Sequence, residues 1–164
     1  LIRMVLQNSR ESEISLSDEI RMLSLYGELE QARFKLNFSF EIKVNGDLDA
    51  KNITIPVMLL QPLVENAIIH GVLPCNRPGS ILISFQKHQN SLQCLVADNG
   101  VGRKATRSKK SKNNIHKSVG LSLLRDRIDL LDKIRKKGHQ MIIKDNVNKL
   151  GEAEGTVVEI LIPF

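Results

Sequence analysis

Two short segments of the sequence carry side chains that could bind a charged ligand. The first, residues 60–71, has helical periodicity and places Asn66 and His70 on one helix face, with Glu65 beside them. A side-chain amide oxygen suits Mg²⁺, which fills its remaining positions with water and phosphate oxygens. A single helical asparagine more often caps its helix or bridges it to a loop, so Asn66 alone does not predict a metal site.

The second segment, residues 98–102, has the sequence Asp-Asn-Gly-Val-Gly and follows a strand-like run at 91–97. A carboxylate at a strand end, here Asp98, can accept a hydrogen bond from an exocyclic amine such as that of adenine. Gly100 and Gly102 have no Cβ, so the backbone can approach a ligand closely there. The pentapeptide alone is more simply a turn. A helix and a strand end in this order, however, are what a nucleotide site needs.

A basic segment separates this strand end from a second helix. Residues 103–117 contain seven Lys or Arg and no Asp or Glu, so this one segment accounts for the net charge of +6. Gly120 and Leu121 then open a helix whose first amides could bind phosphate, while the basic segment closes over it as a lid. A solvated lysine-rich loop is the alternative. Further on, Thr156 could place a hydroxyl next to Asp98, or could simply favour a strand.

The spacing of apolar residues predicts the elements that must hold these groups. Ser17 is a candidate N-cap for a helix that extends to about Phe34, and the alternation at 38–44 predicts a strand. In the first segment, Pro62 fits only the first helical turn, and Gly71 is expected to end the helix. This pattern predicts an α/β fold, a two-layer sandwich with a mixed, mostly antiparallel sheet and helices on one face. A further helix is expected at 119–136, and further strands at 53–56, 81–86, 91–97, 140–144 and 156–162.

Composition narrows the function classes. The chain has 164 residues, enough for one domain, and the absence of Met at residue 1 indicates a piece of a longer protein. Scarce aromatic residues and the confinement of positive charge to one segment argue against a nucleic-acid partner. We find no membrane-spanning run, signal peptide, zinc-site spacing, P-loop or protein-kinase signature. Cys75 and Cys94 could form a bridge, but two free thiols in a reducing compartment are favoured.

In this order, the motifs resemble those of the ATP-binding domain of LytS-like sensor histidine kinases, in the GHKL superfamily of ATPases with the Bergerat fold. The resemblance covers nearly the whole chain and is carried by five stretches. These are a linker helix at 17–34, an N box at 60–71, a G1 box at 98–102, a G2 box at 118–128 and a closing strand at 155–163.

The resemblance implies an ATP site in which Asn66 holds Mg²⁺ against the phosphates and Asp98 accepts a hydrogen bond from the adenine amine. Residues 103–119 would be the ATP lid. Glu65 is the candidate catalytic residue, since it could polarise the nucleophile or a metal-bound water; a bystander carboxylate on the helix surface is the equal alternative. The other residues implied to line the ATP site are His70, Gly100, Gly102, Gly120, Leu121 and Thr156.

The same resemblance implies a division of the chain and a set of partners. Residues 1–13 would be the end of a dimerisation helix with its linker, and 14–164 the catalytic domain. This domain would bind Mg-ATP for phosphoryl transfer to a histidine on an upstream segment that this sequence lacks, so alone it is not expected to autophosphorylate. The implied partners are that segment, a response regulator and a second copy in the full-length protein. The implied location is the cytoplasmic side of a membrane-bound bacterial sensor.

Three departures from the family pattern keep a second interpretation open. Ile69 stands where the family usually has Lys, Ser118 where it has Gly, and Leu123 where it has Asn. A degenerate GHKL domain that serves for dimerisation or interaction, without nucleotide turnover, would tolerate these changes. An ATP-hydrolysing domain of the gyrase or chaperone type is disfavoured, because those have an acid four residues before the Asn, where this chain has Pro62.

Overall fold

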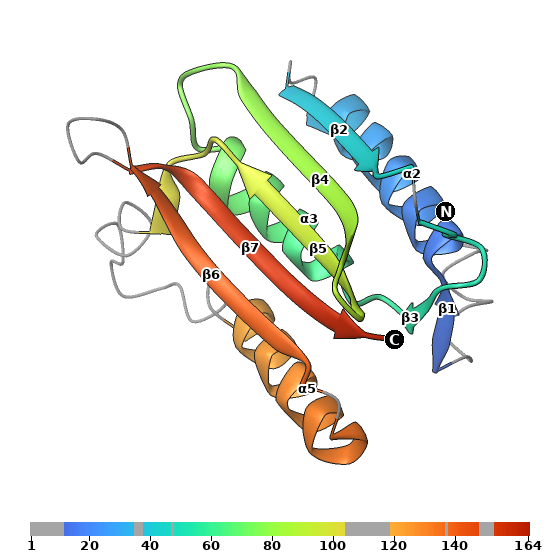
Figure 1. Cartoon of the computed structure of the whole chain (residues 1–164). Helices are drawn as coiled ribbons and strands as arrows, with labels where there is room; N and C mark the ends of the chain where they lie inside the picture. Colours follow the sequence, from blue (N-terminus) through green and yellow to red (C-terminus); the bar gives the residue numbers. More distant parts are fainter. Residues whose placement is uncertain (1–11, 35–37, 47, 104–118, 137, 148–152) are drawn as a thin grey trace.

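A five-stranded sheet with helices packed on one face forms the body of the domain (Figure 1). The computed structural model describes residues 12–34, 38–46, 48–103, 119–136, 138–147 and 153–164. In chain order the elements are β1 (Glu13–Ser15), α2 (Leu16–Phe34), β2 (Phe38–Val44), β3 (Thr54–Pro56), α3 (Gln61–Asn66), the π-helix η1 (Ala67–Val72), β4 (Gly79–His88), β5 (Ser91–Asp98), α5 (Val119–Arg135), β6 (Gln140–Val147) and β7 (Ala153–Pro163).

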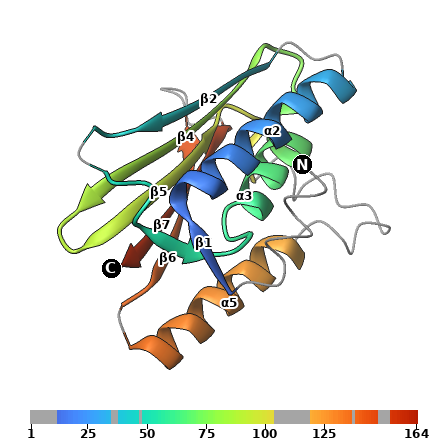
Figure 2. The same cartoon turned by 90° about the vertical axis from the view of Figure 1, so that its right-hand side faces the viewer.

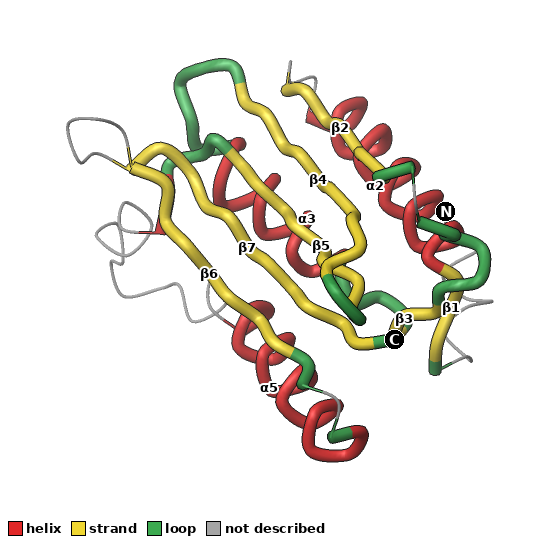
Figure 3. The backbone as a smooth tube through the Cα atoms, in the orientation of Figure 1, coloured by secondary structure: helices red, strands yellow, loops and turns green. Residues whose placement is uncertain are grey.

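The sheet is mixed and mostly antiparallel. Its strand order is β2-β4-β5-β7-β6, and only β2 and β4 pair in parallel. β1 and β3 form a separate two-stranded antiparallel sheet. Figure 2 shows α2, α3 and α5 on the same side of the main sheet, and Figure 3 shows the two layers coloured by element. The predicted two-layer α/β sandwich with helices on one face is therefore confirmed.

Alternating burial along β5 determines which of its side chains face the helices. Leu92, Cys94 and Val96 are buried, whereas the residues between them are partly exposed. Successive side chains of a strand point to opposite faces, so Asp98 falls in the buried register and faces the helical layer. The apolar core lies in this layer, and its largest fully buried side chains include Ile81, Ile83 and Phe85 of β4, Leu63 and Ile68 of the α3–η1 helix, and Ile128 of α5.

A row of polar side chains crosses the opposite face of the sheet. The Gln86 amide donates to Gln93, and the Gln93 amide donates to Glu159. The Lys144 Nζ atom lies 3.5 Å from the Glu159 carboxylate on the next strand. A face with such a polar row suits contact with water, as one face of an antiparallel sheet commonly does.

The linker helix α2 differs from the prediction at its start. It begins at Leu16, and the Asp18 N–H donates to Ser15 Oγ at 3.1 Å, so Ser15 and not Ser17 caps the helix. Ser17 lies already within the first helical turn, because β1 leads directly into the helix without a loop. The predicted end at Phe34 is confirmed.

The helix that carries Asn66 does not end at Gly71, as the sequence predicted. After the α-helical part Gln61–Asn66 it continues as the π-helix Ala67–Val72. The Leu73 N–H donates to the carbonyl of Ile68, five residues back, at 2.9 Å. A π-helical turn is wider than an α-helical one and is frequent at functional sites. Here Gly71 remains inside the helix and serves a close approach to a strand end, described below.

The remaining predicted elements are confirmed, and several are longer than expected. β2 has the predicted bounds and α5 ends one residue earlier, while β4 and β6 extend further because pairing continues to their ends. Cys75 and Cys94 are both free thiols. No helix in the described part of the chain has the length and apolar character that crossing a membrane requires. Residues 1–11 of the predicted dimerisation helix and linker, and residues 104–118 of the predicted lid, lie outside the described residues.

Candidate functional site

The Asp98 carboxyl group is the buried polar centre of the site. It is 7% exposed at the end of β5, and its Oδ1 accepts a hydrogen bond from the Gly100 N–H at 2.8 Å. In the sheet, Asp98 lies opposite Thr156 of β7, which is also buried. Burial raises the pKa of Asp98 to about 6, while the N–H groups of Gly100 and Thr156 act to lower it. The site therefore holds a carboxylate that is ionised near neutral pH and oriented by backbone donors.

Three glycines allow close packing at Asp98, because an added Cβ at any of them would clash with Asp98 or with the Gly71 backbone beside it. A Cβ added to Gly71 would lie 2.8 Å from Asp98 Oδ1, and one added to Gly100 would lie 2.3 Å from the Gly71 carbonyl carbon. A Cβ on Gly155 would lie 1.9 Å from the Asp98 carbonyl oxygen, and Gly155 has a φ of +122°. The Val101 N–H also donates to the Gly71 carbonyl at 3.1 Å. The helix, the turn and β7 thus meet at Asp98 by backbone contact.

The α3–η1 helix brings its polar residues to the same end of the sheet. Asn66 lies at the junction of the α and π parts, and Gly71 follows it in the π part against Asp98. Asn66 and His70 are partly exposed, and Glu65 is exposed. Within the described part of the chain, the side-chain amide of Asn66 has no hydrogen-bond partner. A partly exposed amide without a protein partner fits a ligand role, because its oxygen is available to a cation.

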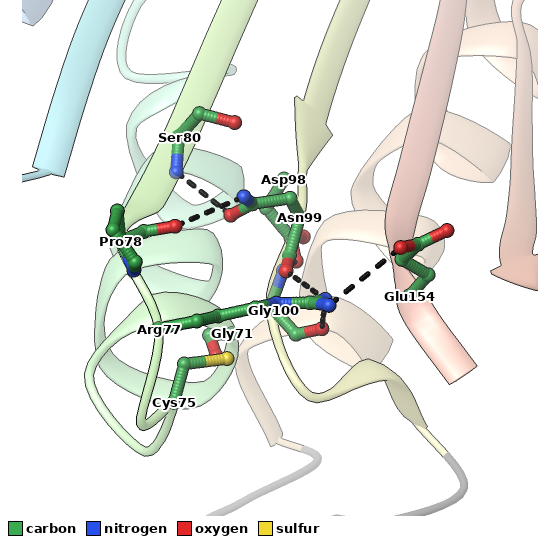
Figure 4. A network of polar contacts seen from close by, with 9 residues as sticks. All are labelled: Gly71, Cys75, Arg77, Pro78, Ser80, Asp98, Asn99, Gly100 and Glu154. Atoms are coloured by element: carbon green, nitrogen blue, oxygen red, sulfur yellow. Dashed lines mark hydrogen bonds and ion pairs between the residues drawn. The ribbon is translucent and has the colours of Figure 1, made fainter. Parts of the chain in front are cut away.

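The turn after Asp98 is tied to the segment that precedes β4 (Figure 4). The Asn99 amide donates to the Pro78 carbonyl at 3.1 Å and accepts from the Ser80 N–H at 2.7 Å. Arg77 Nη2 donates to the Asn99 carbonyl at 2.6 Å, and Arg77 Nη1 lies 3.6 Å from the carboxylate of Glu154. The sequence analysis missed Arg77. Its partners are backbone carbonyls distant in sequence, and no local pattern marks such a contact.

The start of the α3–η1 helix is held by a second buried acid, Glu19 of α2. Glu19 is 1% exposed and accepts a hydrogen bond from the Leu60 N–H at 3.1 Å. Burial raises the pKa of Glu19 to about 7, against smaller opposing effects of the Leu60 and Met58 N–H groups and of Arg127. Arg127 of α5 donates to the Val57 carbonyl at 2.9 Å. Both α2 and α5 therefore hold the loop that leads into the site helix.

The boundaries of the predicted lid are partly visible. Gly102 has a φ of +72°, which favours glycine, and Arg103 forms a two-point contact with Asp145 of β6 at 2.6 and 3.0 Å. At the other end, Gly120 is exposed in the first turn of α5, with nothing within 4 Å of an added Cβ. Leu121 is partly buried against the core. A glycine at 120 is therefore not required by packing.

Comparisons with known proteins give relatives of one kind. The LytS sensor protein of Staphylococcus saprophyticus is 31% identical over 166 residues, which cover 97% of this chain and 26% of that protein. The sensor histidine kinase YpdA of Escherichia coli is 38% identical over 93 residues, which cover 56% of this chain and 16% of that protein. No model of a protein family matches the chain.

Solved structures of histidine kinases share the fold. The histidine kinase domain of the blue-light activated kinase EL346 from Erythrobacter litoralis has a TM-score of 0.62 at 16% identity, covering 92% of this chain and 61% of that one. The histidine kinase ThkA, solved in complex with the response regulator TrrA, has a TM-score of 0.57 at 18% identity, covering 99% of this chain and 46% of that one.

The chain belongs to the LytS-like family of sensor histidine kinases. It has the fold of a histidine kinase catalytic domain, and it spans 26% and 16% of the lengths of the two curated relatives above. In this kinase domain, the structure brings Asp98, Gly100 and Thr156 together with the π-helix that follows Asn66. Gly120 and Leu121 lie on a different element, α5, which packs against α3 and β6.

The described residues of this domain contain no cluster of three or more His, Cys, Asp or Glu side chains that could hold a metal ion. Asn66 offers one amide oxygen to a Mg²⁺ ion. This donor set still fits Mg²⁺, which is commonly bound by one or two protein oxygens together with phosphate oxygens and water. It does not fit zinc, which is held by three or four protein ligands.

Proposed function

We propose that this domain binds Mg-ATP and is the catalytic part of a sensor histidine kinase that phosphorylates a histidine on an upstream segment. The observation that carries the proposal is the buried Asp98 carboxyl group, held at a strand end among three glycines. A carboxylate so placed can discriminate between bases, because a buried acceptor left without a donor costs more than an exposed one. Residues 14–164 form the catalytic domain in this proposal, and 103–119 form the ATP lid.

At the base end of the site, Asp98 accepts a hydrogen bond from the exocyclic amine of adenine. The Gly100 N–H fixes the carboxylate in advance, so the nucleotide does not have to order it. Gly71 leaves room for this carboxyl group, and Gly100 and Gly155 allow the backbones next to it to pack closely. Thr156, opposite Asp98 in the sheet, supports the same end through its backbone N–H.

At the phosphate end, Asn66 supplies an amide oxygen to Mg²⁺. The ion, when bound, neutralises charge on the phosphate oxygens. His70 lies on the same helix, and the first amides of α5, at Gly120 and Leu121, offer donors to a phosphate. Phosphoryl transfer depends mainly on such positioning and charge stabilisation, so the chain needs no covalent intermediate.

Glu65 is the candidate catalytic residue within this proposal. It is exposed beside Asn66, where a carboxylate can orient an attacking group or a metal-bound water. A Glu65→Gln variant should keep its affinity for ATP and lose phosphoryl transfer by about 10²-fold or more in the full-length protein. Unchanged transfer in that variant would make Glu65 a surface carboxylate without a role in the reaction.

Titration with a fluorescent ATP analogue, with and without Mg²⁺, tests the proposal. The wild-type domain should bind the analogue, and Mg²⁺ should strengthen binding. Asn66→Ala should remove most of the Mg²⁺ effect while binding without metal stays close to that of wild type. Absence of binding at millimolar nucleotide would refute the proposal, and an undiminished Mg²⁺ effect in Asn66→Ala would remove Asn66 from its role.

One observation favours a second candidate function. Ile69, where the family usually has Lys, packs against the core instead of offering a charge to phosphate. A domain that no longer binds nucleotide and serves for dimerisation or interaction would need no such charge. The same titration separates the two functions, because only the kinase function requires binding.

The remaining proposals concern the full-length protein. We place this domain next to an upstream dimerisation segment that carries the phosphoacceptor histidine, so the domain alone should not autophosphorylate. A response regulator is the expected recipient of the phosphoryl group, and the solved complex of ThkA with the response regulator TrrA supports a partner of this class. A cytoplasmic position in a membrane-bound homodimeric sensor follows from the same proposal.

A further inference from the structure

Arg77 connects three segments that are separate in sequence. It lies in the connection between η1 and β4, and its Nη2 donates to the carbonyls of Asn99 at 2.6 Å and Gly100 at 3.4 Å. Its Nη1 lies 3.6 Å from the carboxylate of Glu154, just before Gly155. Figure 4 shows the guanidinium group between the turn after Asp98 and the start of β7. One side chain thus links the η1–β4 connection, the turn and the closing strand.

The turn at 98–100 begins where β5 ends, and it is held to neighbouring segments by hydrogen bonds from Arg77, from Asn99 and from the Val101 N–H. The carbonyls of Asn99 and Gly100 point to the side where Arg77 lies, and a planar guanidinium with five N–H donors can bond two carbonyls and a carboxylate at once. Lysine has one ammonium group and cannot reproduce this arrangement. On the inner side of the same turn, the Gly100 N–H donates to Asp98. The Asn99 carbonyl that Arg77 binds and the Gly100 N–H that orients the Asp98 carboxylate therefore belong to the same peptide group.

We propose that Arg77 is a positioning residue of the nucleotide site. It holds the turn that fixes Asp98, so that the carboxylate is already oriented when adenine arrives. The inference rests on the proposed function, since it concerns the affinity for ATP. Arg77 acts through Asp98 and the turn, not by touching the triphosphate.

Two predictions separate this role from a general structural one. First, loss of Arg77 should lower the affinity for ATP more than the affinity for inosine triphosphate. Inosine triphosphate lacks the exocyclic amine but has the same triphosphate. Second, the effects of Arg77 and Asp98 should not add, because both act on the same hydrogen bond to the base. A residue that only stabilised the fold would weaken both nucleotides equally, and its effect would add to that of Asp98→Asn.

The experiment measures the affinities of ATP and inosine triphosphate by calorimetry in the presence of Mg²⁺. Arg77→Ala should lower the affinity for ATP by about tenfold, which is the effect of one hydrogen bond to a preorganised group. It should lower the affinity for inosine triphosphate by less than about threefold. Arg77→Lys should fall between wild type and Arg77→Ala. In an Asp98→Asn background, Arg77→Ala should have no further effect. Arg21→Ala, which removes an exposed arginine on α2, is the matched control and should change neither affinity.

Measurements without nucleotide test whether the Arg77→Ala variant is folded. Arg77 is 44% exposed, so Arg77→Ala should keep a cooperative thermal transition. Amide hydrogen exchange at Gly100 and Val101 should become faster in Arg77→Ala and stay unchanged in Arg21→Ala, because local opening of the turn becomes easier. Unchanged exchange together with unchanged ATP affinity overturns the inference. If wild type binds no ATP, the proposed function is wrong. If ATP binding depends on Asp98 but is unchanged in Arg77→Ala, only this inference is wrong.

Discussion

Two buried carboxyl groups, Glu19 and Asp98, lie at opposite ends of the α3–η1 helix and are built in different ways. Glu19 holds the start of the helix through the Leu60 N–H, and Asp98 lies against its last turn at Gly71. Burial raises the pKa of both, to about 7 and about 6. A raised pKa therefore does not distinguish a binding acid from a structural one in this domain.

The surroundings of the two groups do distinguish them. The close neighbours of Asp98 are the backbones of Gly71, Gly100 and Gly155, whereas Glu19 lies between α2 and the non-glycine loop that leads into α3. Glycine backbones therefore pack against Asp98, whereas the segment that Glu19 holds has no glycine. We therefore assign Asp98 to ligand binding and Glu19 to holding the helix in place.

The largest expected difference between the two regions is their tolerance of an added methyl group. Gly100→Ala would place a Cβ 2.3 Å from the Gly71 backbone, so the helix or the turn must move. We expect a loss of about 3 kcal/mol in the free energy of unfolding, measured by urea denaturation. Gly46→Ala is the control, because nothing lies within 4 Å of its added Cβ. Equal stabilities of the two variants would contradict the close backbone contact at Asp98.

Glu19→Gln should change the pH dependence of stability. The folded-state pKa of Glu19 is about 7, above the ordinary 4.5, so folding favours the protonated form and stability is lost as pH rises from 4.5 to about 7. Glutamine keeps the acceptor for Leu60 without the charge. The free energy of unfolding of Glu19→Gln, relative to that of wild type, should rise by roughly 3 kcal/mol between pH 4.5 and about pH 8.

Chemical denaturation across this pH range measures the Glu19 effect, and Glu28→Gln on the exposed side of α2 is the matched control. Glu28→Gln should show a constant difference from wild type. A constant difference for Glu19→Gln as well would mean that Glu19 is not a buried acid with a raised pKa. Because Glu19 is assigned no ligand role, the variant should also bind ATP as wild type does.

A smaller effect is expected in the pH dependence of nucleotide recognition. The pKa of Asp98 is about 6, so lowering the pH below that value protonates the acceptor for the adenine amine. The preference for ATP over inosine triphosphate should then fall by up to about tenfold per pH unit. The ratio of the two affinities cancels protonation of the triphosphate, which both nucleotides share. A ratio that stays constant down to about pH 5 would exclude the Asp98 carboxylate as the acceptor.

The sequence predicted the elements that carry the candidate site better than the contacts that hold them together. The strand at 91–97 was predicted, and the burial register of β5 places Asp98 in the buried layer. Periodicity predicted neither the π-helix nor the close approach of Gly100 to Gly71, which lies within it. Glu19 had the position of an exposed acid in a first helical turn, and its burial depends on the tertiary packing of α2 against the Leu60 loop.

Arg77 and Ser15 illustrate the same limit at the level of hydrogen bonds. Arg77 bonds to carbonyls of a turn far along the chain, which any residue type could provide, so the sequence carries no mark of the contact. Ser15 and Ser17 are both suitable caps, and the choice between them depends on where β1 ends. Local patterns therefore predicted elements and candidate residues, while the contacts between elements came only from the fold.

The central claim is that Asp98 binds the adenine amine, and calorimetric titration of wild type and Asp98→Asn with ATP and inosine triphosphate tests it most directly. Wild type should prefer ATP by about 10- to 100-fold, the contribution of a hydrogen bond to a charged group. Asp98→Asn should bind the two nucleotides about equally and unfold at a temperature close to that of wild type. A wild-type domain without preference, or an Asp98→Asn variant that keeps it, would contradict the claim.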